Sequence, residues 1–87
     1  MIKFKMVIEM EDFMKHIEIN PKILLGKPVI RGTRIPLELI VKLVAHGWKD
    51  EDIIKEYSSL KNKDIRAALL YAEKMLKEEE VYPILKI

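Results

Sequence analysis

The sequence predicts a mainly α domain, in which a three-helix, helix-turn-helix bundle follows an N-terminal β-strand and a β-hairpin. Three observations lead to this prediction: an alternating pattern at the start of the chain, a segment rich in glycine, proline and cations at residues 20–36, and three segments with helical spacing. We expect one domain over residues 1–87, with a β-rich arm (1–36), a helical core (37–80) and an apolar tail (81–87).

The β-rich arm holds two strand-like patterns. Apolar side chains recur at every second position across residues 2–10, which is the period of a strand with one buried face. An unpaired strand needs a partner, so this segment should pair with another segment or with a second copy, and we expect a homodimer. Residues 16–19 alternate again and predict a second short strand before the turn-favouring Asn20-Pro21.

Residues 29–35 predict a tight hairpin. Gly32 suits the first central position of a type II′ turn, because that position needs a positive φ that glycine adopts at low cost. Arg31 and Arg34 would flank the turn and point to the same side. Pro36 would end the extended chain and form the first residue of a helix, where its missing N–H costs nothing.

Three segments then show the i, i+3, i+4 spacing of helices: residues 37–46, 50–57 and 62 to about 79. The first has the widest apolar stripe and should be the most buried, with Gly47 as the residue that ends it. The second opens with acids, which favour the positive end of the helix dipole. Asn62 is a good N-cap for the third.

Composition excludes several classes of protein. No apolar run approaches the roughly 18 residues that a membrane span needs. The chain has no cysteine, which excludes disulfides, thiolate zinc sites and cysteine nucleophiles. We expect a cytoplasmic protein with no membrane contact and no cofactor or metal, and its bias towards Lys and Glu is typical of proteins from thermophiles.

No catalytic pattern is evident, and we expect that the protein is not an enzyme. His16 and His46 are isolated, and no serine has a plausible base nearby in the sequence. The acids at residues 50–52 are typical of a helix start rather than of a metal site. Trp48 is expected to fill the core or to pack on the turn after the first helix, because a base-stacking role would require exposure.

A specific string of residues resembles the DUF433 family, and the resemblance covers residues 16–75. It is carried by Asn20-Pro21, by Gly26-Lys27-Pro28-Val29-Ile30-Arg31-Gly32-Thr33-Arg34-Ile35-Pro36, by Gly47, Ile53, Tyr57 and Leu60, and by Asp64-Ile65-Arg66-Ala67-Ala68-Leu69. The resemblance implies a homeodomain-like three-helix fold with an N-terminal β element. It also implies an antitoxin role beside a PIN-like ribonuclease toxin.

Three positions depart from the family pattern. Leu25 stands where a second glycine is usual, and Ser58 stands where a proline commonly follows the tyrosine. Lys49 replaces a frequent Ser or Thr cap and leaves that role to Asp50. Each departure concerns local turn geometry rather than the fold.

The second and third helical segments, with the link at residues 58–61, have helix-turn-helix proportions. The start of the third helix would enter the major groove, and the basic hairpin would contact the DNA backbone or the minor groove. Residues 21–36 carry Lys22, Lys27, Arg31 and Arg34 and no acid, a local charge of +4 in a chain of net charge +2. Asp64 would oppose close approach of phosphate, and a solvated loop on a plain scaffold is the alternative. The candidate DNA-binding residues are Arg31, Thr33, Arg34, Asn62, Lys63 and Arg66.

The apolar tail is the candidate partner-binding segment. Residues 81–87 could add a strand to the sheet edge of a partner or pack back onto the last helix. The candidate residues are Val81, Tyr82, Ile84 and Leu85. The leading hypothesis is an antitoxin-like regulator of a toxin–antitoxin pair, which binds a PIN-like ribonuclease and its own promoter DNA. The alternative is a structural or protein-interaction module without DNA binding.

Overall fold

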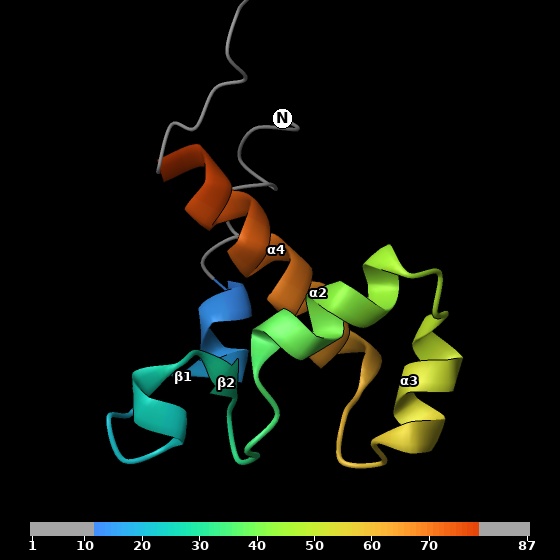
Figure 1. Cartoon of the computed structure of the whole chain (residues 1–87), viewed down its shortest axis with the longest axis horizontal. Helices are drawn as coiled ribbons and strands as arrows, with labels where there is room; N and C mark the ends of the chain where they lie inside the picture. Colours follow the sequence, from blue (N-terminus) through green and yellow to red (C-terminus); the bar gives the residue numbers. More distant parts are fainter. Residues whose placement is uncertain (1–11, 79–87) are drawn as a thin grey trace, which may run out of the picture.

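The computed structural model describes residues 12–78, which form a small helical bundle with a two-stranded antiparallel sheet (Figure 1). The helices are α2 (Leu37–Ala45), α3 (Asp50–Glu56) and α4 (Asn62–Glu78), and the strands are β1 (Ile17–Glu18) and β2 (Val29–Ile30). Two short 3₁₀ turns, η1 (Met14–His16) and η2 (Leu24–Gly26), complete the order. The predicted mainly α bundle with a hairpin before it is therefore confirmed. The predicted strand at residues 2–10 and the tail at residues 81–87 lie outside the described residues.

The sheet joins two segments that are distant in sequence. β1 pairs with β2 in the register Ile17↔Ile30 and Glu18↔Val29. The chain then turns back, and Val29 forms a second antiparallel bridge with Pro36. The second predicted strand and the return of the hairpin are thus both present.

The hairpin turn differs from the predicted one. The amide of Thr33 donates to the carbonyl of Ile30 at 3.0 Å, so the turn begins at Ile30 and Gly32 is its third residue. Gly32 has φ +81°, the positive value that the third position of a type II turn requires. The need for glycine was predicted correctly, but its place as the first central residue of a type II′ turn was wrong.

The bounds of α2 follow from its two ends. Pro36 has extended backbone angles (φ −72°, ψ 146°) and precedes the helix, so it is not the first helical residue that the sequence suggested. At the other end Gly47 has φ +90°, and the amide of Trp48 donates to the carbonyl of Leu43 at 3.0 Å. These are the features of a glycine-terminated helix, as predicted for Gly47.

The N-termini of α3 and α4 are capped in the same way, by an aspartate side chain that accepts a hydrogen bond from the backbone amide of a preceding lysine. Asp52 accepts from the amide of Lys49 at 3.2 Å, and Asp64 accepts from the amide of Lys61 at 2.9 Å. Two predicted caps are therefore wrong. Asp50 is the first residue of α3 and Asn62 is the first residue of α4, so neither precedes its helix as a cap. The third residue of each helix supplies the capping oxygen instead.

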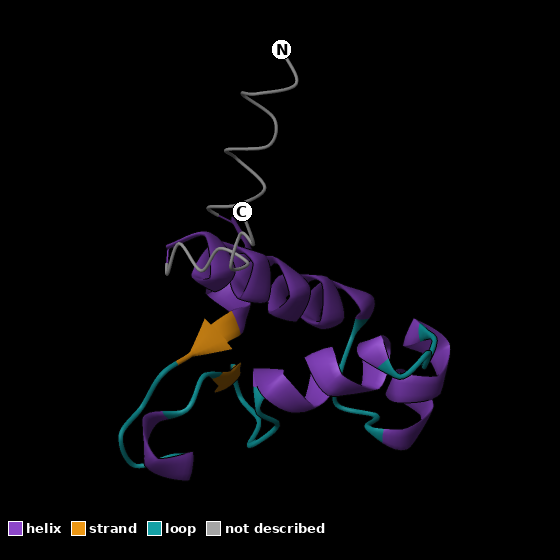
Figure 2. Ribbon diagram, turned by 45° about the horizontal axis from the view of Figure 1, so that its top comes forward, coloured by secondary structure: helices purple, strands orange, loops and turns teal. Residues whose placement is uncertain are grey.

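The core lies where α2 crosses α4, with α3 and the sheet packed at its sides (Figures 1 and 2). Ala67 and Ala68 on α4 are fully buried and let α2 approach closely. Trp48 does not belong to this core. The residue is 40% exposed, so the first of its two expected places, in the core, was wrong. The second, packing on the turn after the first helix, stays a prediction. The buried core residues are Phe13, Ile17, Ile30, Leu37, Ile40, Ile53, Leu60, Ile65, Ala67 and Ala68.

Candidate nucleic-acid interface

The start of α4 and the loop after β2 lie on a common side of the molecule, around one depression of about 670 Å³. Its lining residues are His16, Arg31, Ser59, Lys61, Asn62, Lys63 and Asp64. Three of the six candidate DNA-binding residues, Arg31, Asn62 and Lys63, are therefore brought together. They come from segments that lie about thirty residues apart in the sequence.

Arg31 is held rigidly at this depression. Its Nε donates to the carbonyl of Lys15 and its Nη2 to the carbonyl of Ile17, each at 2.8 Å. Its backbone amide donates to the carbonyl of His16, also at 2.8 Å. These bonds fix a guanidinium against the edge of β1, while its remaining N–H donors can still meet an anion.

Asp64 faces the interior of the protein. The residue is only 9% exposed, and both of its carboxylate oxygens are engaged. Oδ1 lies 3.1 Å from His16 Nδ1, and Oδ2 accepts from the amide of Lys61. Both oxygens are therefore occupied by protein donors, which weakens the objection that this acid would keep phosphates away.

The first turn of α4 presents cations outward. Lys61, Asn62 and Lys63 are all exposed, whereas Ile65 behind them is buried. The start of a helix also offers amide N–H groups and the positive end of the helix dipole, which favour anions. Lys61 adds to the six candidate residues, and its charge and its place just before the helix already point to it in the sequence.

Two other candidates from the hairpin are placed differently. The Thr33 hydroxyl donates to the carbonyl of Ile30 at 2.7 Å and accepts from the amide of Ile35 at 3.0 Å, so it builds the turn. Arg34 is exposed but does not line the depression. The predicted pairing of Arg31 with Arg34 on one surface is therefore not seen at this depression.

Arg66 lines a neighbouring smaller depression of about 210 Å³, which Lys63 shares. Asp12 lines it as well, and its carboxylate lies 3.0 Å from the ammonium of Lys15. The hydrogen bond and the positive charge of Lys15 lower the pKa of Asp12. This exposed acid therefore stays ionised beside Lys63 and Arg66.

The helix-turn-helix unit consists of α3, the link at residues 57–61 and α4. Leu60 anchors the link in the core, and its amide donates to the carbonyl of Tyr57 at 3.0 Å. Asn62, Lys63 and Arg66 lie on the outer side of α4. This is the part of a second helix that meets base edges in helix-turn-helix proteins.

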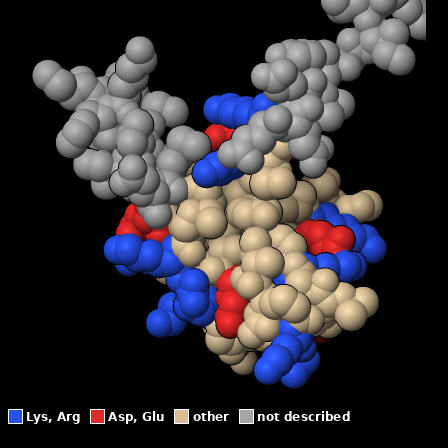
Figure 3. Space-filling model, turned by 90° about the vertical axis from the view of Figure 1, so that its left-hand side faces the viewer, with Lys and Arg blue, Asp and Glu red and all other residues tan. Residues whose placement is uncertain are grey.

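Charge is not spread evenly over the molecule. On the face drawn in Figure 3, Lys and Arg side chains form separate groups around an uncharged centre, with Asp and Glu side chains among them. Electrostatic attraction for a polyanion on that face is therefore local.

Among residues 12–78, no group of His, Asp or Glu side chains is arranged to hold a metal ion. Within the same residues, no helix has the length and apolar character needed to cross a membrane.

Comparison with known proteins identifies the family. The model of a family described as "Protein of unknown function (DUF433)" matches residues 17–72, and the chain belongs to this family. The uncharacterized protein y4eO of Sinorhizobium fredii is 43% identical over 54 residues, which cover 62% of this chain but only 24% of that protein. The crystal structure of a DUF433 member protein from Anabaena variabilis has the same fold, with a TM-score of 0.68 and 27% identity over 85% of this chain and 73% of that one. The resemblance found in the sequence is confirmed.

Proposed function

We propose that this chain is a non-catalytic, antitoxin-like regulator in the cytoplasm, which binds duplex DNA through the α3–α4 unit and a PIN-like ribonuclease through its apolar tail. The DNA-binding part is supported by one observation above all. Arg31, Lys61 and Lys63 line one depression at the start of α4, and Asp64, the acid that also lines it, has both carboxylate oxygens bound to protein groups.

In this proposal the first turns of α4 enter the major groove. Asn62 and Arg66 are the residue types that read adenine and guanine edges, respectively. Lys61, Lys63 and Arg31 contact phosphates on either side and set the orientation of the helix. Because hydrogen bonds to backbone carbonyls already fix Arg31, little side-chain freedom is lost when it meets a phosphate.

The test is binding of a promoter duplex, measured by fluorescence anisotropy between 50 and 200 mM salt. Three phosphate contacts predict a slope of log K against log salt of about −2.7, since each contact contributes roughly −0.9. The double variant Lys61→Ala/Lys63→Ala should reduce this slope by about 2. Lys42→Ala, on α2 and away from the depression, is the matched control and should leave the slope unchanged. Binding that does not depend on salt would contradict the DNA-binding role.

The ribonuclease part follows from the family resemblance and from the composition of the tail. Tyr82→Ala/Leu85→Ala should weaken binding to a PIN-like nuclease encoded by the neighbouring gene, as measured by calorimetry. Unchanged affinity would remove the tail from this role.

A protein-interaction module without DNA binding is the second candidate, and a different observation favours it. The chain has an apolar groove between α2 and α4, a kind of surface that suits a protein segment better than a polyanion. The two candidates differ in the salt experiment, because only the first predicts a steep slope.

A further inference from the structure

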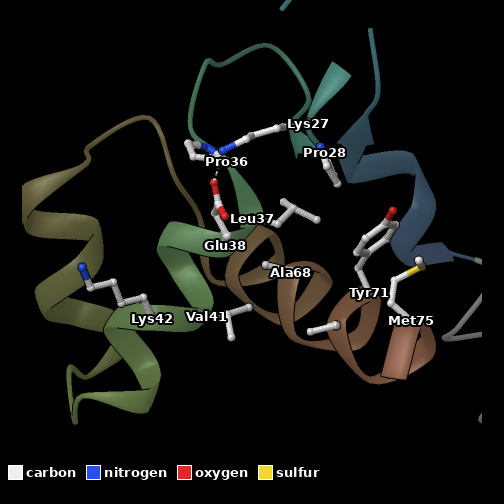
Figure 4. Close-up of a pocket in the computed structure, with 11 residues that line it drawn as sticks. Lys27, Pro28, Pro36, Leu37, Glu38, Val41, Lys42, Ala68, Tyr71 and Met75 are labelled. Carbon is white, nitrogen blue, oxygen red and sulfur yellow. Dashed lines mark hydrogen bonds and ion pairs between the residues drawn. The ribbon is translucent and has the colours of Figure 1, made fainter. Parts of the chain in front are cut away.

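An apolar groove of about 490 Å³ lies between α2, α4 and the chain on either side of the hairpin. Its walls include Pro28, Leu37, Val41, Ala68, Tyr71 and Met75. Figure 4 shows Lys27 and Glu38 beside Pro36 at one end, and Tyr71 and Met75 at the other. Lys27 and Glu38 form an ion pair of 2.8 Å, so these two charges at the rim compensate each other.

The chemistry of the walls limits the occupant. A small polar ligand would need several convergent hydrogen-bonding groups to fix its orientation, and this groove is walled mostly by carbon. A short run of apolar side chains would instead fill the space and remove the walls from water, at about 25 cal/mol per Å² of apolar surface.

We propose that the occupant is the chain's own C-terminal segment, residues 81–87, which folds back along α4. The segment reads Val-Tyr-Pro-Ile-Leu-Lys-Ile, so apolar residues predominate. It follows directly on α4, the helix that forms one wall of the groove, and Met75 at the end of the groove lies three residues before the last described residue, Glu78. The inference does not depend on the proposed DNA binding. It competes with nuclease binding, because residues 81–87 cannot lie in the groove and on a nuclease at the same time.

The length of this segment is sufficient. The wall from Ala68 to Met75 is about 10 Å long, at roughly 1.5 Å per helical residue. Residues 81–87 can span about 23 Å when extended, at roughly 3.3 Å each. Residues 79–80 therefore remain for the reversal, and Pro83 opposes continuation of the helix.

The N-terminal segment is a poorer candidate for the groove. The described chain begins at Asp12, which lines the small depression beside Lys63, Arg66, Ala67 and Leu70 of α4. The groove instead meets Ala68, Tyr71, Ala72 and Met75, a stripe shifted by five residues and hence by about 140° around the helix. The described chain thus begins on a different side of α4 from the groove.

Paired cysteines give a direct test, because the full chain contains no cysteine of its own. Ala72→Cys is combined in turn with Tyr82→Cys, Ile84→Cys or Leu85→Cys, and each protein is oxidised at low concentration. At least one pair should form an intrachain disulfide, seen as a monomer of altered mobility on a non-reducing gel and confirmed by peptide mass spectrometry. The matched control is Glu73→Cys with the same tail cysteines, since Glu73 is the next residue of α4, is exposed and does not line the groove.

The possible outcomes separate clearly. Intrachain disulfides with position 72 and not with position 73 support the proposal. Interchain disulfides would overturn it in favour of a second copy as the source of the segment, and equal or absent cross-linking at both positions would overturn it altogether. A second measurement uses Ile84→Asp/Leu85→Asp in the full chain, which should raise the fluorescence of the apolar dye ANS several-fold as the groove opens, and an unchanged signal would contradict the proposal.

Discussion

Asp64 and His16 meet across 48 positions of sequence, with Nδ1 of the histidine 3.1 Å from Oδ1 of the aspartate. The same carboxylate closes the start of α4 through the amide of Lys61. One buried side chain therefore caps the N-terminus of α4 and also connects this helix to η1, which precedes the sheet. This double use makes Asp64 a link between the helical core and the segment that precedes the sheet.

Asp64→Ala should consequently destabilise the fold more than loss of a cap alone. It removes a capping oxygen and leaves His16 and the amide of Lys61 without this partner, for which we expect a loss of about 2–3 kcal/mol in the free energy of unfolding. Urea denaturation measures this loss. The matched control is Asp52→Ala, which removes the equivalent cap of α3 and should cost about 1 kcal/mol. Equal losses for the two variants would show that the contact with His16 adds nothing.

Leu25→Gly should stabilise the protein. Leu25 has φ +57° between Leu24 at φ +48° and Gly26 at φ +83°, and its side chain is 96% exposed. A left-handed conformation costs a residue with a Cβ about 1–2 kcal/mol, and glycine avoids this cost. Glycine also makes the unfolded chain more flexible, which offsets about 0.5–1 kcal/mol of the gain. We expect a net gain of about 0.5–1 kcal/mol in thermal or urea unfolding.

Leu25→Ala is the control for this gain, because it removes the same exposed side chain but keeps the Cβ. Its stability should stay within about 0.5 kcal/mol of the parent protein. A gain in the alanine variant equal to that in the glycine variant would mean that relief of the backbone is not the cause.

Lysine should not substitute for Arg31 without a loss of stability. The guanidinium donates to the carbonyls of Lys15 and Ile17 from two different nitrogens, a geometry that a single ammonium cannot reproduce. We expect Arg31→Lys and Arg31→Ala each to lose about 1–2 kcal/mol in urea unfolding. Full stability of the lysine variant would contradict this role. The loss also means that weaker DNA binding by an Arg31 variant needs a parallel stability measurement, which Lys61 and Lys63 variants need less.

Lys15→Ala should raise the pKa of Asp12 towards its ordinary value, because the hydrogen bond and charge of Lys15 lower it. The lowered pKa means that the folded state binds this proton less readily than the unfolded state does. The small stabilisation that results is present above the ordinary pKa of an aspartate and is lost as the pH falls through the lowered value. An NMR titration of the side-chain carboxyl measures the shift, with Lys77→Ala as a distant control. A pKa of Asp12 that stays the same in Lys15→Ala would contradict the assignment.

The helical part of the fold could be predicted from the sequence because the apolar spacing in each segment is regular. The bounds of α2 and α3 and the start of α4 fall within one residue of the predicted ones, whereas the predicted end of α4 lies outside the described residues. The hairpin turn could not be fixed in this way, since a glycine supplies positive φ at either central position. The amide of Arg31 donates to the carbonyl of His16, fifteen residues earlier, and this hydrogen bond helps set the register between β1 and β2.

The candidate site shows the same division. The residue types and the exposed start of α4 were predictable from the sequence. The anchoring of Arg31 by carbonyls of Lys15 and Ile17 depends on tertiary contacts that no local pattern contains. The inward turn of Asp64 depends in the same way on His16.

The closure of α4 has a consequence for how the surface can change over evolution. The bond from Asp64 uses the main-chain amide at position 61 and not the lysine side chain. Any residue except proline can supply that amide, so position 61 can exchange one outward group for another while the helix still begins in the same place. The surface chemistry at this corner can therefore change while the cap of α4 is kept.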